Sequence, residues 1–383
     1  MKCKELFNEI EKLNSKYIDM WQEFCNIESP TAYKEGVDKC GAYVADWAKD
    51  MGFEVEVCHQ EKAGDVICIT MNPHAKEQPF CISGHMDTVH PVGLFGTPAV
   101  KMDEEKIYGP GVTDCKGGIV AGMLSMEALK NTGFETRPVI LLLQTDEEVG
   151  SKLSGKKTIE YICGKSEGAI GFLNLEGYTA HKGVIARKGI LTLEFRVKGI
   201  KAHSAACALG GANAIAEAAH KIIEMEKLKD DEGLTCNCGL ITGGTVVNTV
   251  PDKCVFKANI RFASSKEYDY VLDYAQKVAD TIHVPGCSCT TAIVGMRPAM
   301  ELKEKNINLF ENINRIYREN HLTELETLFA RGGSDGAYVT IAGIPCVDSL
   351  GVEGGNIHTS DEFAYLKSLK ESAKRVASVV YCI

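Results

Sequence analysis

Apolar residues recur every three or four positions in two stretches near the start of the chain. The stretches are 6–24 and 37–51, and this spacing places the apolar residues on one side of an α-helix. Gly52 is suited to end the second helix, because glycine readily adopts the left-handed conformation that follows many helices. A further stretch at 119–130 predicts another amphipathic helix.

Continuous apolar runs predict strands between these helices. Runs at 80–83, 138–144 and 169–175 are apolar along most of their length. Strands of this kind suit a parallel sheet that is covered on both faces. Strands alternate with helices as far as Glu176, and this alternation predicts an α/β domain.

A different order of elements begins near residue 184. The pattern predicts a strand at 190–197, a helix at 212–226, strands at 234–241 and 254–262, a helix at 268–282 and a strand at 288–294. This order is typical of the split βαβ arrangement of a ferredoxin-like domain. The α/β pattern then resumes near Arg297. We therefore predict a discontinuous first domain, 1–183 and 297–383, and an inserted second domain, 184–296.

Composition and charge narrow the classes of function. The chain has 383 residues and is 45% hydrophobic, which is enough for a large core and two domains. Its net charge of -10 argues against a nucleic-acid partner, since phosphate binding needs a basic surface. No apolar run is long enough to span a membrane, and the start leads into a charged amphipathic helix rather than a signal peptide. We therefore expect a cytoplasmic protein without a membrane partner.

Sixteen cysteines raise the question of disulfides or structural zinc. Many, such as Cys68, Cys81 and Cys346, lie within apolar runs as small hydrophobic residues, and a cytosolic chain keeps them reduced. The pairs at 236 and 238 and at 287 and 289 are each separated by one residue, which is closer than structural zinc sites use. Cysteines that alternate along one face of a strand are the better interpretation.

Side chains that can bind metals follow the three apolar runs. His85 comes after the first run, Glu147 and Glu148 after the second, and Glu176 directly after the third. Open α/β sheets bind their ligands beyond the carboxyl ends of the strands. We therefore expect His85, Glu148 and Glu176 to face one crevice.

Two glycine-rich loops supply further candidates. Asp114 lies in the loop 109–118, and His358 follows another pair of glycines. Taken alone, Asp114 could cap a helix, His358 could be an ordinary loop residue, and His85 could be a hydrogen-bonded core histidine. Together, two histidines and three carboxylates at strand ends and in glycine-rich loops favour a two-metal hydrolase, because catalytic zinc takes such ligands and paired metals share a bridging group.

Short motifs surround these residues in a definite order. The motifs lie at 84–89, 109–118, 145–151, 175–176, 202–204, 332–335 and 358–362. In residues and in order they resemble the M20 metallopeptidase family over nearly the whole chain. The resemblance implies an α/β fold of the di-zinc exopeptidase type, with a mixed sheet flanked by helices and an inserted α+β ferredoxin-like dimerisation or lid domain.

The resemblance also implies the ligand set. Asp114 would bridge two zinc ions in each subunit, His85 and Glu176 would complete one site, and Glu148 and His358 would complete the other. Cobalt or manganese would suit the same ligands.

Three residues beside the metals acquire roles by the same resemblance. Glu147 would be the general base, and Asp87 would accept the second ring N–H of His85 and fix its tautomer. His203 would help to stabilise the tetrahedral oxyanion; an ordinary surface histidine is the alternative. Cys115 stands where many family members have a second acidic residue, and it could add a thiolate near the bridge.

Further residues match positions that hold the substrate α-carboxylate in family members. Arginine suits this role because its fork can bind a carboxylate through two hydrogen bonds. An interdomain salt bridge is the alternative role for Arg297, and Arg261 is a weaker candidate. The matching residues are Arg297, Asn248, Gly332, Gly333 and Ser334.

The motifs most resemble those of glutamate carboxypeptidase. We therefore predict release of a C-terminal amino acid, with an acidic one among the candidates, from a small peptide or N-acyl conjugate. An N-acyl-amino-acid deacylase or a dipeptidase of the same family is the alternative enzyme. A catalytically inert metal-binding scaffold protein is a third hypothesis, although such a protein would have no use for a general base such as Glu147. By resemblance, the inserted domain is expected to form a homodimer and to carry His203 to the partner's metal site.

Overall fold

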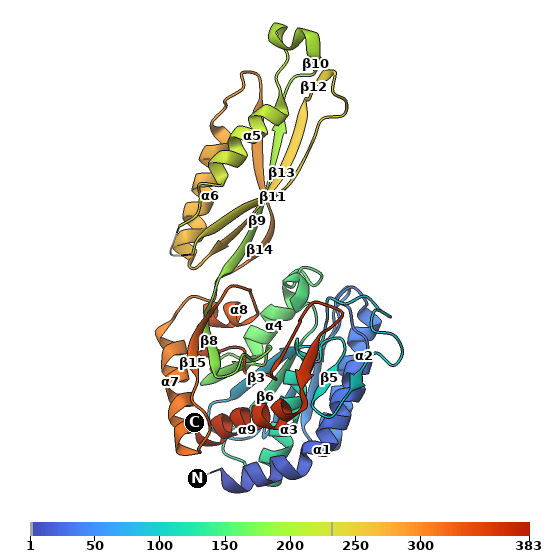
Figure 1. Cartoon of the computed structure of the whole chain (residues 1–383). Coiled ribbons are helices and arrows are strands. Elements are labelled where there is room, and N and C mark those ends of the chain that lie inside the picture. Colours follow the sequence, from blue (N-terminus) through green and yellow to red (C-terminus); the bar gives the residue numbers. More distant parts are fainter. Residues whose placement is uncertain (1–2, 231–232) are drawn as a thin grey trace. The chain divides into compact units, whose positions relative to one another are not determined.

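The structure is a computed structural model that describes residues 3–230 and 233–383, and it divides into two compact units (Figure 1). Unit 1 comprises Met1–Ile185, Leu302–Leu328 and Ser334–Ile383, and unit 2 comprises Ala186–Glu301 and Phe329–Gly333. The sequence predicts that the segment Phe329–Gly333 belongs to the first domain. It groups with unit 2 because the Lys188 N–H donates to the Ala330 carbonyl and Arg187 donates to the Gly332 carbonyl.

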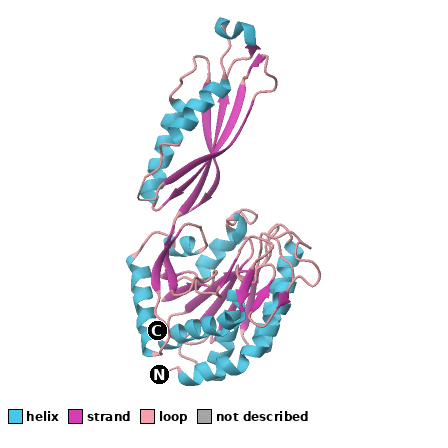
Figure 2. Ribbon diagram, viewed as in Figure 1, coloured by secondary structure: helices cyan, strands magenta, loops and turns pink. Residues whose placement is uncertain are grey.

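Unit 1 is built on a six-stranded mixed sheet in the order β1-β2-β6-β3-β7-β16. The first two pairings are antiparallel and the other three are parallel. Figure 2 shows helices packed around this sheet, and the mixed α/β fold that the sequence predicts is confirmed. The strands are β1 (Glu54–Cys58), β2 (Val66–Met71), β6 (Val139–Gln144), β3 (Phe80–His85), β7 (Gly171–Asn174) and β16 (Cys346–Val347).

The first two helices follow the predicted periodicity. Helix α1 (Lys4–Asn26) buries Leu6, Ile10 and Trp21 among other apolar residues, and each side chain of this size contributes about 1.5–3 kcal/mol when fully buried. Helix α2 (Lys34–Asp50) is followed by Gly52, whose φ is +70°. The other helices of unit 1 are α3 (Lys116–Asn131), α4 (Lys157–Lys165), α7 (Glu304–Glu319), α8 (Gly336–Ile341) and α9 (Leu366–Cys382).

Helix α3 differs from the prediction, because it is not amphipathic. Every residue from 116 to 129 is buried, since α1, α9 and β3 all pack against this helix. Gly118 allows a very close approach: a Cβ atom there would lie 2.0 Å from the carbonyl oxygen of Leu175. The start of α3 therefore lies directly against the residue that precedes Glu176.

Two small sheets contain further strands of unit 1, and the strands of the second continue past its residues Ile185 and Leu328. Strands β17 (Gly354–Gly355), β18 (Phe363–Tyr365), β5 (Lys106–Tyr108) and β4 (Lys101–Met102) form one sheet in that order. Strand β8 (Lys182–Arg187) pairs with β15 (Glu326–Ala330). Because β18 pairs with β5, the loop that contains His358 lies beside the segment that leads to Asp114.

Unit 2 has the four-stranded sheet of a ferredoxin-like domain, in the order β11-β13-β9-β14. Alternate residues of β13 are buried, and the rings of Phe256 and Phe195 stack 4.6 Å apart in the core. One face of the sheet therefore packs against the two helices. The elements are β9 (Gly189–Lys198), α5 (Ala214–Met225), β11 (Thr235–Gly243), β13 (Lys253–Phe262), α6 (Ser265–Asp280) and β14 (Ser288–Arg297), with the short pair β10 (Ala202–His203) and β12 (Thr249–Val250).

Cysteines behave as small core residues in the strands of unit 1. Cys68, Cys81 and Cys346 are all buried there. On β11, Cys236 is buried and Cys238 is partly buried. Within the described residues, no helix is both long enough and apolar enough to cross a membrane.

Candidate metal centre

Three of the candidate ligands come from adjacent strand ends. His85 is the last residue of β3, Glu148 lies in the short 3-10 turn Glu147–Val149 after β6, and Glu176 follows β7. Strand β3 pairs in parallel with both β6 and β7. Parallel pairing brings the carboxyl ends of these strands to one edge of the sheet.

The two loop residues join this edge from opposite parts of the chain. Asp114 Oδ1 lies 3.2 Å from His85 Nε2, and Asp114 Oδ2 lies 3.0 Å from His358 Nε2. Each oxygen of one carboxylate therefore faces a different imidazole. Asp114 does not cap the following helix, because Cys115 occupies that position and no side chain caps the helix there.

Each histidine also has its own glutamate. Glu176 Oε2 lies 3.7 Å from His85 Nε2, and Glu148 Oε2 lies 3.3 Å from His358 Nε2. Potential ligand atoms of His85, Asp114 and Glu148 all lie within 4.8 Å of one another. The structure thus brings all five candidate ligands together as two groups that share Asp114.

Burial and hydrogen bonds shift the pKa values of the side chains in this cluster. Burial raises the pKa of Glu176 well above its usual range and that of Glu148 to about 7. Burial also opposes ionisation of Asp114, but hydrogen bonds from His358 and His85 hold its pKa well below the usual value. The same kind of hydrogen bond, to Asp114 and then to Glu148, raises the pKa of His358 to about 10.

This set of side chains fits divalent metal ions. Three ionised carboxylates would carry more negative charge than two protonated imidazoles can balance, and burial without a further cation raises the pKa of both Glu148 and Glu176. Imidazole nitrogen and carboxylate oxygen are the usual ligands of catalytic zinc, and a shared carboxylate suits a pair of ions. The residues present can therefore hold two ions.

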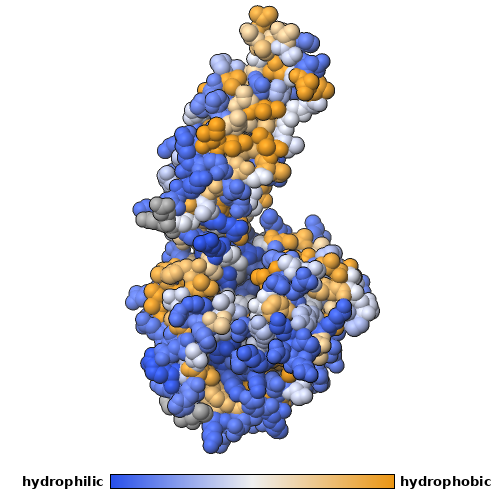
Figure 3. Space-filling model, viewed as in Figure 1, coloured by the Kyte–Doolittle hydropathy of each residue, from blue (hydrophilic) through white to orange (hydrophobic). Residues whose placement is uncertain are grey.

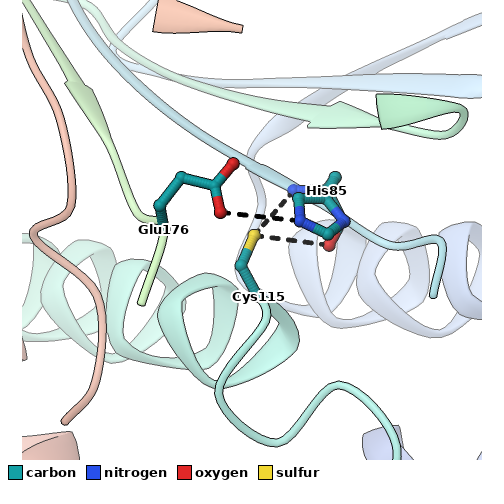
Figure 4. Close-up of side chains that lie close together, drawn as sticks. All are labelled: His85, Cys115 and Glu176. Carbon is teal, nitrogen blue, oxygen red and sulfur yellow. Dashed lines mark hydrogen bonds and ion pairs between the residues drawn. The ribbon is translucent and has the colours of Figure 1, made fainter. Parts of the chain in front are cut away.

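Cys115 lies beside His85 and Glu176, as Figure 4 shows. The backbone N–H of His85 donates to Cys115 Sγ over 3.0 Å, and Sγ lies 3.6 Å from the His85 carbonyl oxygen. Ligand atoms of His85, Cys115 and Glu176 lie within 4.8 Å of one another. Burial raises the pKa of the Cys115 thiol. The Cys115 side chain is thus a buried thiol that packs on the His85 main chain.

Asp87 faces the His85 ring with both its main chain and its side chain, and its predicted role stays a prediction. His85 Nδ1 lies 2.9 Å from the backbone carbonyl oxygen of Asp87, whereas the nearest carboxylate oxygen is 3.5 Å away. The carboxylate also accepts hydrogen bonds from the backbone N–H groups of Glu147 and Glu148, each over 3.2 Å, and from Thr31 Oγ1 over 2.8 Å. Both contacts can orient the His85 ring, and the carboxylate also holds the turn that contains the predicted base.

Thr31 was not among the predicted residues. It reaches Asp87 from 56 positions earlier in the chain, so no local pattern could have indicated this contact. Glu147 itself is buried in the turn next to Glu148.

Two predicted residues, His203 and Asn248, come together within unit 2. His203 lies opposite Thr249 in the β10–β12 pair, and the Ser204 N–H donates to the Asn248 carbonyl over 3.0 Å. Both His203 and Asn248 are exposed. His203 Nδ1 accepts a hydrogen bond from the Ala205 N–H over 3.2 Å, so the ring faces its own loop at this nitrogen.

Arg297 and Gly333, two further predicted residues, lie in contact in unit 2. A Cβ atom at Gly333 would lie 2.4 Å from Arg297 Cδ, so the arginine stem packs directly on this backbone. Ser334 belongs to unit 1, where its buried hydroxyl donates to Asp348. Arg261 Nη1 reaches the Arg331 carbonyl over 3.4 Å. The roles predicted for these residues remain predictions.

Comparison with known proteins places this site in a family. The model of peptidase family M20/M25/M40 matches residues 81–381. The chain belongs to this family. Carboxypeptidase G2 from Pseudomonas sp. (strain RS-16) is 27% identical over 352 residues, which cover 90% of this chain and 83% of that protein. A succinyl-diaminopimelate desuccinylase from Nitrosospira multiformis is 25% identical over 367 residues, which cover 90% and 92%. The prediction of a metal-dependent hydrolase is confirmed.

Solved structures of the same fold cover almost the whole chain. An aminopeptidase from Bacillus cereus matches with a TM-score of 0.81 and 20% identity, over 96% of this chain and 98% of its own. A dinuclear metal-binding peptidase of the M20 family from Bacillus subtilis matches with a TM-score of 0.72 and 13% identity, over 97% and 98%. At these identities the likeness confirms the fold.

Proposed function

We propose that this hydrolase uses two metal ions to cleave an amide bond and release a C-terminal amino acid from a small peptide or an N-acyl conjugate. The position of Asp114 is the main support. Its two carboxylate oxygens lie 3.2 and 3.0 Å from the imidazoles of His85 and His358. A carboxylate placed between two histidines is suited to bridge two ions.

The distances within the cluster support one division of the ligands. His85, Asp114 and Glu176 would hold one ion, and Asp114, Glu148 and His358 would hold the other. Zinc suits these ligands, and cobalt or manganese would suit them as well. When bound, a pair of such ions lowers the pKa of a water molecule and polarises the scissile carbonyl.

Proton transfer falls to Glu147. It would accept a proton from the attacking water and then pass this proton to the leaving nitrogen, a contribution of about 10²–10⁴ in rate. The hydrogen bond from its backbone N–H to Asp87 holds Glu147 in a defined turn. His203 would donate a hydrogen bond to the developing oxyanion.

We assign recognition of the free α-carboxylate of the substrate to Arg297 together with the backbone at Gly332 and Gly333. The glycine at 333 leaves room for the arginine stem against the backbone, and the guanidinium fork can bind a carboxylate through two hydrogen bonds. Together with the similarity to carboxypeptidase G2, this favours cleavage next to a C-terminal amino acid. The desuccinylase relative supports an N-acyl-amino-acid deacylase as the second candidate.

A homodimer is also part of the proposal, and it would form through unit 2. Strand β11 lies at the edge of its sheet, and Figure 3 shows apolar side chains on the visible surface of unit 2. Exposed edges and apolar patches favour association with another chain. The exposed apolar residues on or near β11 and α5 are Ile215, Ile223, Leu240, Ile241, Val246 and Val247.

The test is hydrolysis of a defined panel by the full chain. The panel contains N-acyl glutamates, N-acyl neutral amino acids, N-succinyl amino acids and dipeptides, and mass spectrometry identifies the products. We expect a free C-terminal amino acid, loss of activity on chelation and recovery with added zinc or cobalt. Full activity after verified metal removal would exclude the two-metal mechanism. Preference for N-succinyl substrates would favour the desuccinylase-like function.

A further inference from the structure

The carboxylate of Glu362 is buried close to the metal centre but is not one of the ligand candidates. Its residue is 1% exposed, and it lies four positions after His358 at the end of the same loop. A buried carboxylate is unfavourable unless hydrogen bonds or charges compensate it. The partners of this carboxylate therefore indicate its role.

Three backbone N–H groups of the Asp114 loop point at Glu362. Oε1 accepts from the N–H of Thr113 over 2.9 Å and from that of Asp114 over 3.1 Å. Oε2 accepts from the N–H of Gly111 over 3.4 Å. Neighbouring N–H groups that converge in this way form an anion-binding nest, here filled by a side chain of the protein itself.

A fourth partner comes from the loop after β3. His90 Nε2 lies 2.9 Å from Glu362 Oε2, and His90 is 5% exposed. The His90 ring packs edge-on against Phe95, with centroids 5.0 Å apart. His90 follows His85 by only five positions, so Glu362 is also tied to the segment that contains the first ligand.

The main chain beside Glu362 strengthens the same connection. The Gly109 N–H donates to the Glu362 carbonyl over 3.2 Å, and Thr113 Oγ1 donates to the Phe363 carbonyl over 2.6 Å. These contacts join the His358 loop to the Asp114 loop on both sides of the nest. Rotation of Asp114 about its backbone would break the hydrogen bond from its own N–H.

We propose that Glu362, supported by His90, is a positioning residue that holds the backbone of Asp114 so that its carboxylate can serve both metal ions. The inference rests on the proposed function, because it assumes that Asp114 bridges the ions. Glu362 does not touch substrate in this role. It acts by joining the loop that follows His85 to the two loops that contain Asp114 and His358.

The test compares Glu362→Gln with a matched substitution, Glu127→Gln, in the full chain. Glu127 is also a buried carboxylate, 5% exposed, that accepts hydrogen bonds from Tyr17 over 2.6 Å and Lys16 over 2.7 Å. It lies thirteen residues after Asp114 near the far end of α3, about 20 Å away along the helix. Zinc is titrated calorimetrically into chelator-treated protein, and backbone hydrogen exchange is measured without metal.

We expect Glu362→Gln to weaken zinc binding by about 10–100-fold, as loss of a partner that orients a ligand usually does. Glu127→Gln should leave the zinc Kd within about twofold of the wild type, because it removes no partner of a ligand. In the metal-free protein, the amides of Thr113 and Asp114 should exchange faster in Glu362→Gln than in Glu127→Gln. His90→Gln, which keeps the nest, should weaken zinc binding less than Glu362→Gln.

Two results would overturn the inference: an unchanged zinc Kd in Glu362→Gln, or an equal loss of affinity in Glu127→Gln. If Glu362→Gln does not fold, an unchanged zinc Kd in His90→Gln would overturn it. Failure of the proposed function would look different. In that case the wild-type chain itself would bind no zinc or hydrolyse no member of the panel.

Discussion

The two units place most of their polar candidate residues in different environments. In unit 1, four candidate ligands form a crowded cluster in which the His85 side chain is 2% exposed and the Asp114 side chain is 11% exposed, whereas His358 at its rim is 52% exposed. In unit 2, His203 and Asn248 lie on the surface. Apolar residues such as Ile223 and Val246 are also 62% and 58% exposed there.

This difference separates two kinds of site. All five candidate ligands in unit 1 come from one chain, and the Asp87 and Glu362 carboxylates accept hydrogen bonds from backbone N–H groups of the same cluster. The exposed residues of unit 2 lack such enclosure, and groups of this kind gain a defined geometry when substrate or another subunit covers them. Substitutions within the unit 1 cluster should therefore act directly on chemistry, whereas the effect of substituting the exposed residues of unit 2 should depend on assembly.

The largest effect should come from Glu147→Gln in unit 1. We expect kcat to fall by about 10²–10⁴ because the general base is lost, while both metals remain bound. Steady-state kinetics and metal analysis of the same sample measure these two quantities. Loss of metal would mean that Glu147 and Glu148 have exchanged roles, and Glu160→Gln on the exposed face of α4 is the control.

His203→Ala should next show whether unit 2 acts through another subunit. Loss of an oxyanion donor lowers kcat by about 10²–10³. Refolding His203→Ala together with Glu147→Gln should restore about one quarter of wild-type activity, since half the dimers are then mixed and each has one intact site of two.

The recovered activity decides between two arrangements. A sizeable recovery supports a site that takes Glu147 from one chain and His203 from the other. No recovery, with mixed dimers verified by mass spectrometry, would mean that His203 serves its own subunit or has no catalytic role.

Unit 2 also contains a buried ion pair, and its loss should lower the stability of unit 2 without a direct effect on catalysis. Glu217 and Lys221 are both fully buried, 2.9 Å apart, and Lys221 also donates to the carbonyls of Val278, Ala279 and Thr281. Glu217→Gln leaves the lysine charge unpaired and should destabilise unit 2 by about 3–5 kcal/mol at neutral pH. Hydrogen exchange of unit 2 amides measures this change.

The pH dependence of this pair has a definite sign. Burial opposes ionisation of Glu217, but Lys221 and the N–H groups of Val284 and His283 hold its pKa below 4.5. Its contribution to stability is therefore present above pH 4.5 and is lost as the pH falls through the lowered pKa. The difference between wild type and Glu217→Gln should shrink in acid. Asp269→Asn, at an exposed position on α6, should show no comparable change.

The smallest effect should come from the packing of α3. Gly118→Ala places a Cβ atom 2.0 Å from the Leu175 carbonyl oxygen and should lower stability by about 1–3 kcal/mol. Gly164→Ala in α4 meets no atom within 4 Å and should be neutral or stabilising by up to about 1 kcal/mol. Thermal unfolding of both variants makes the comparison, and equal stabilities would show that α3 can shift without penalty.

Local patterns in the sequence were sufficient for most elements and for the kinds of ligand. Side-chain periodicity predicts helices α1 and α2 and the order of elements in unit 2. Continuous apolar runs predict the buried strands β3, β6 and β7. Both signals depend only on neighbours in the chain. His85, Glu148 and Glu176 could be assigned to one edge because parallel strands end together. The ligand types could likewise be assigned from residue chemistry.

Contacts between distant segments decided the rest. Helix α3 is buried on all sides because α1 and α9 both cover it, and a periodic sequence cannot show how many partners a helix will have. The Asp87 carboxylate holds a turn 60 residues away, and Glu362 binds N–H groups 248 and 249 residues earlier in the chain. The sequence by itself determined which groups could bind metal, but only the tertiary structure set their distances, because backbone hydrogen bonds between remote loops leave no periodic or local signal.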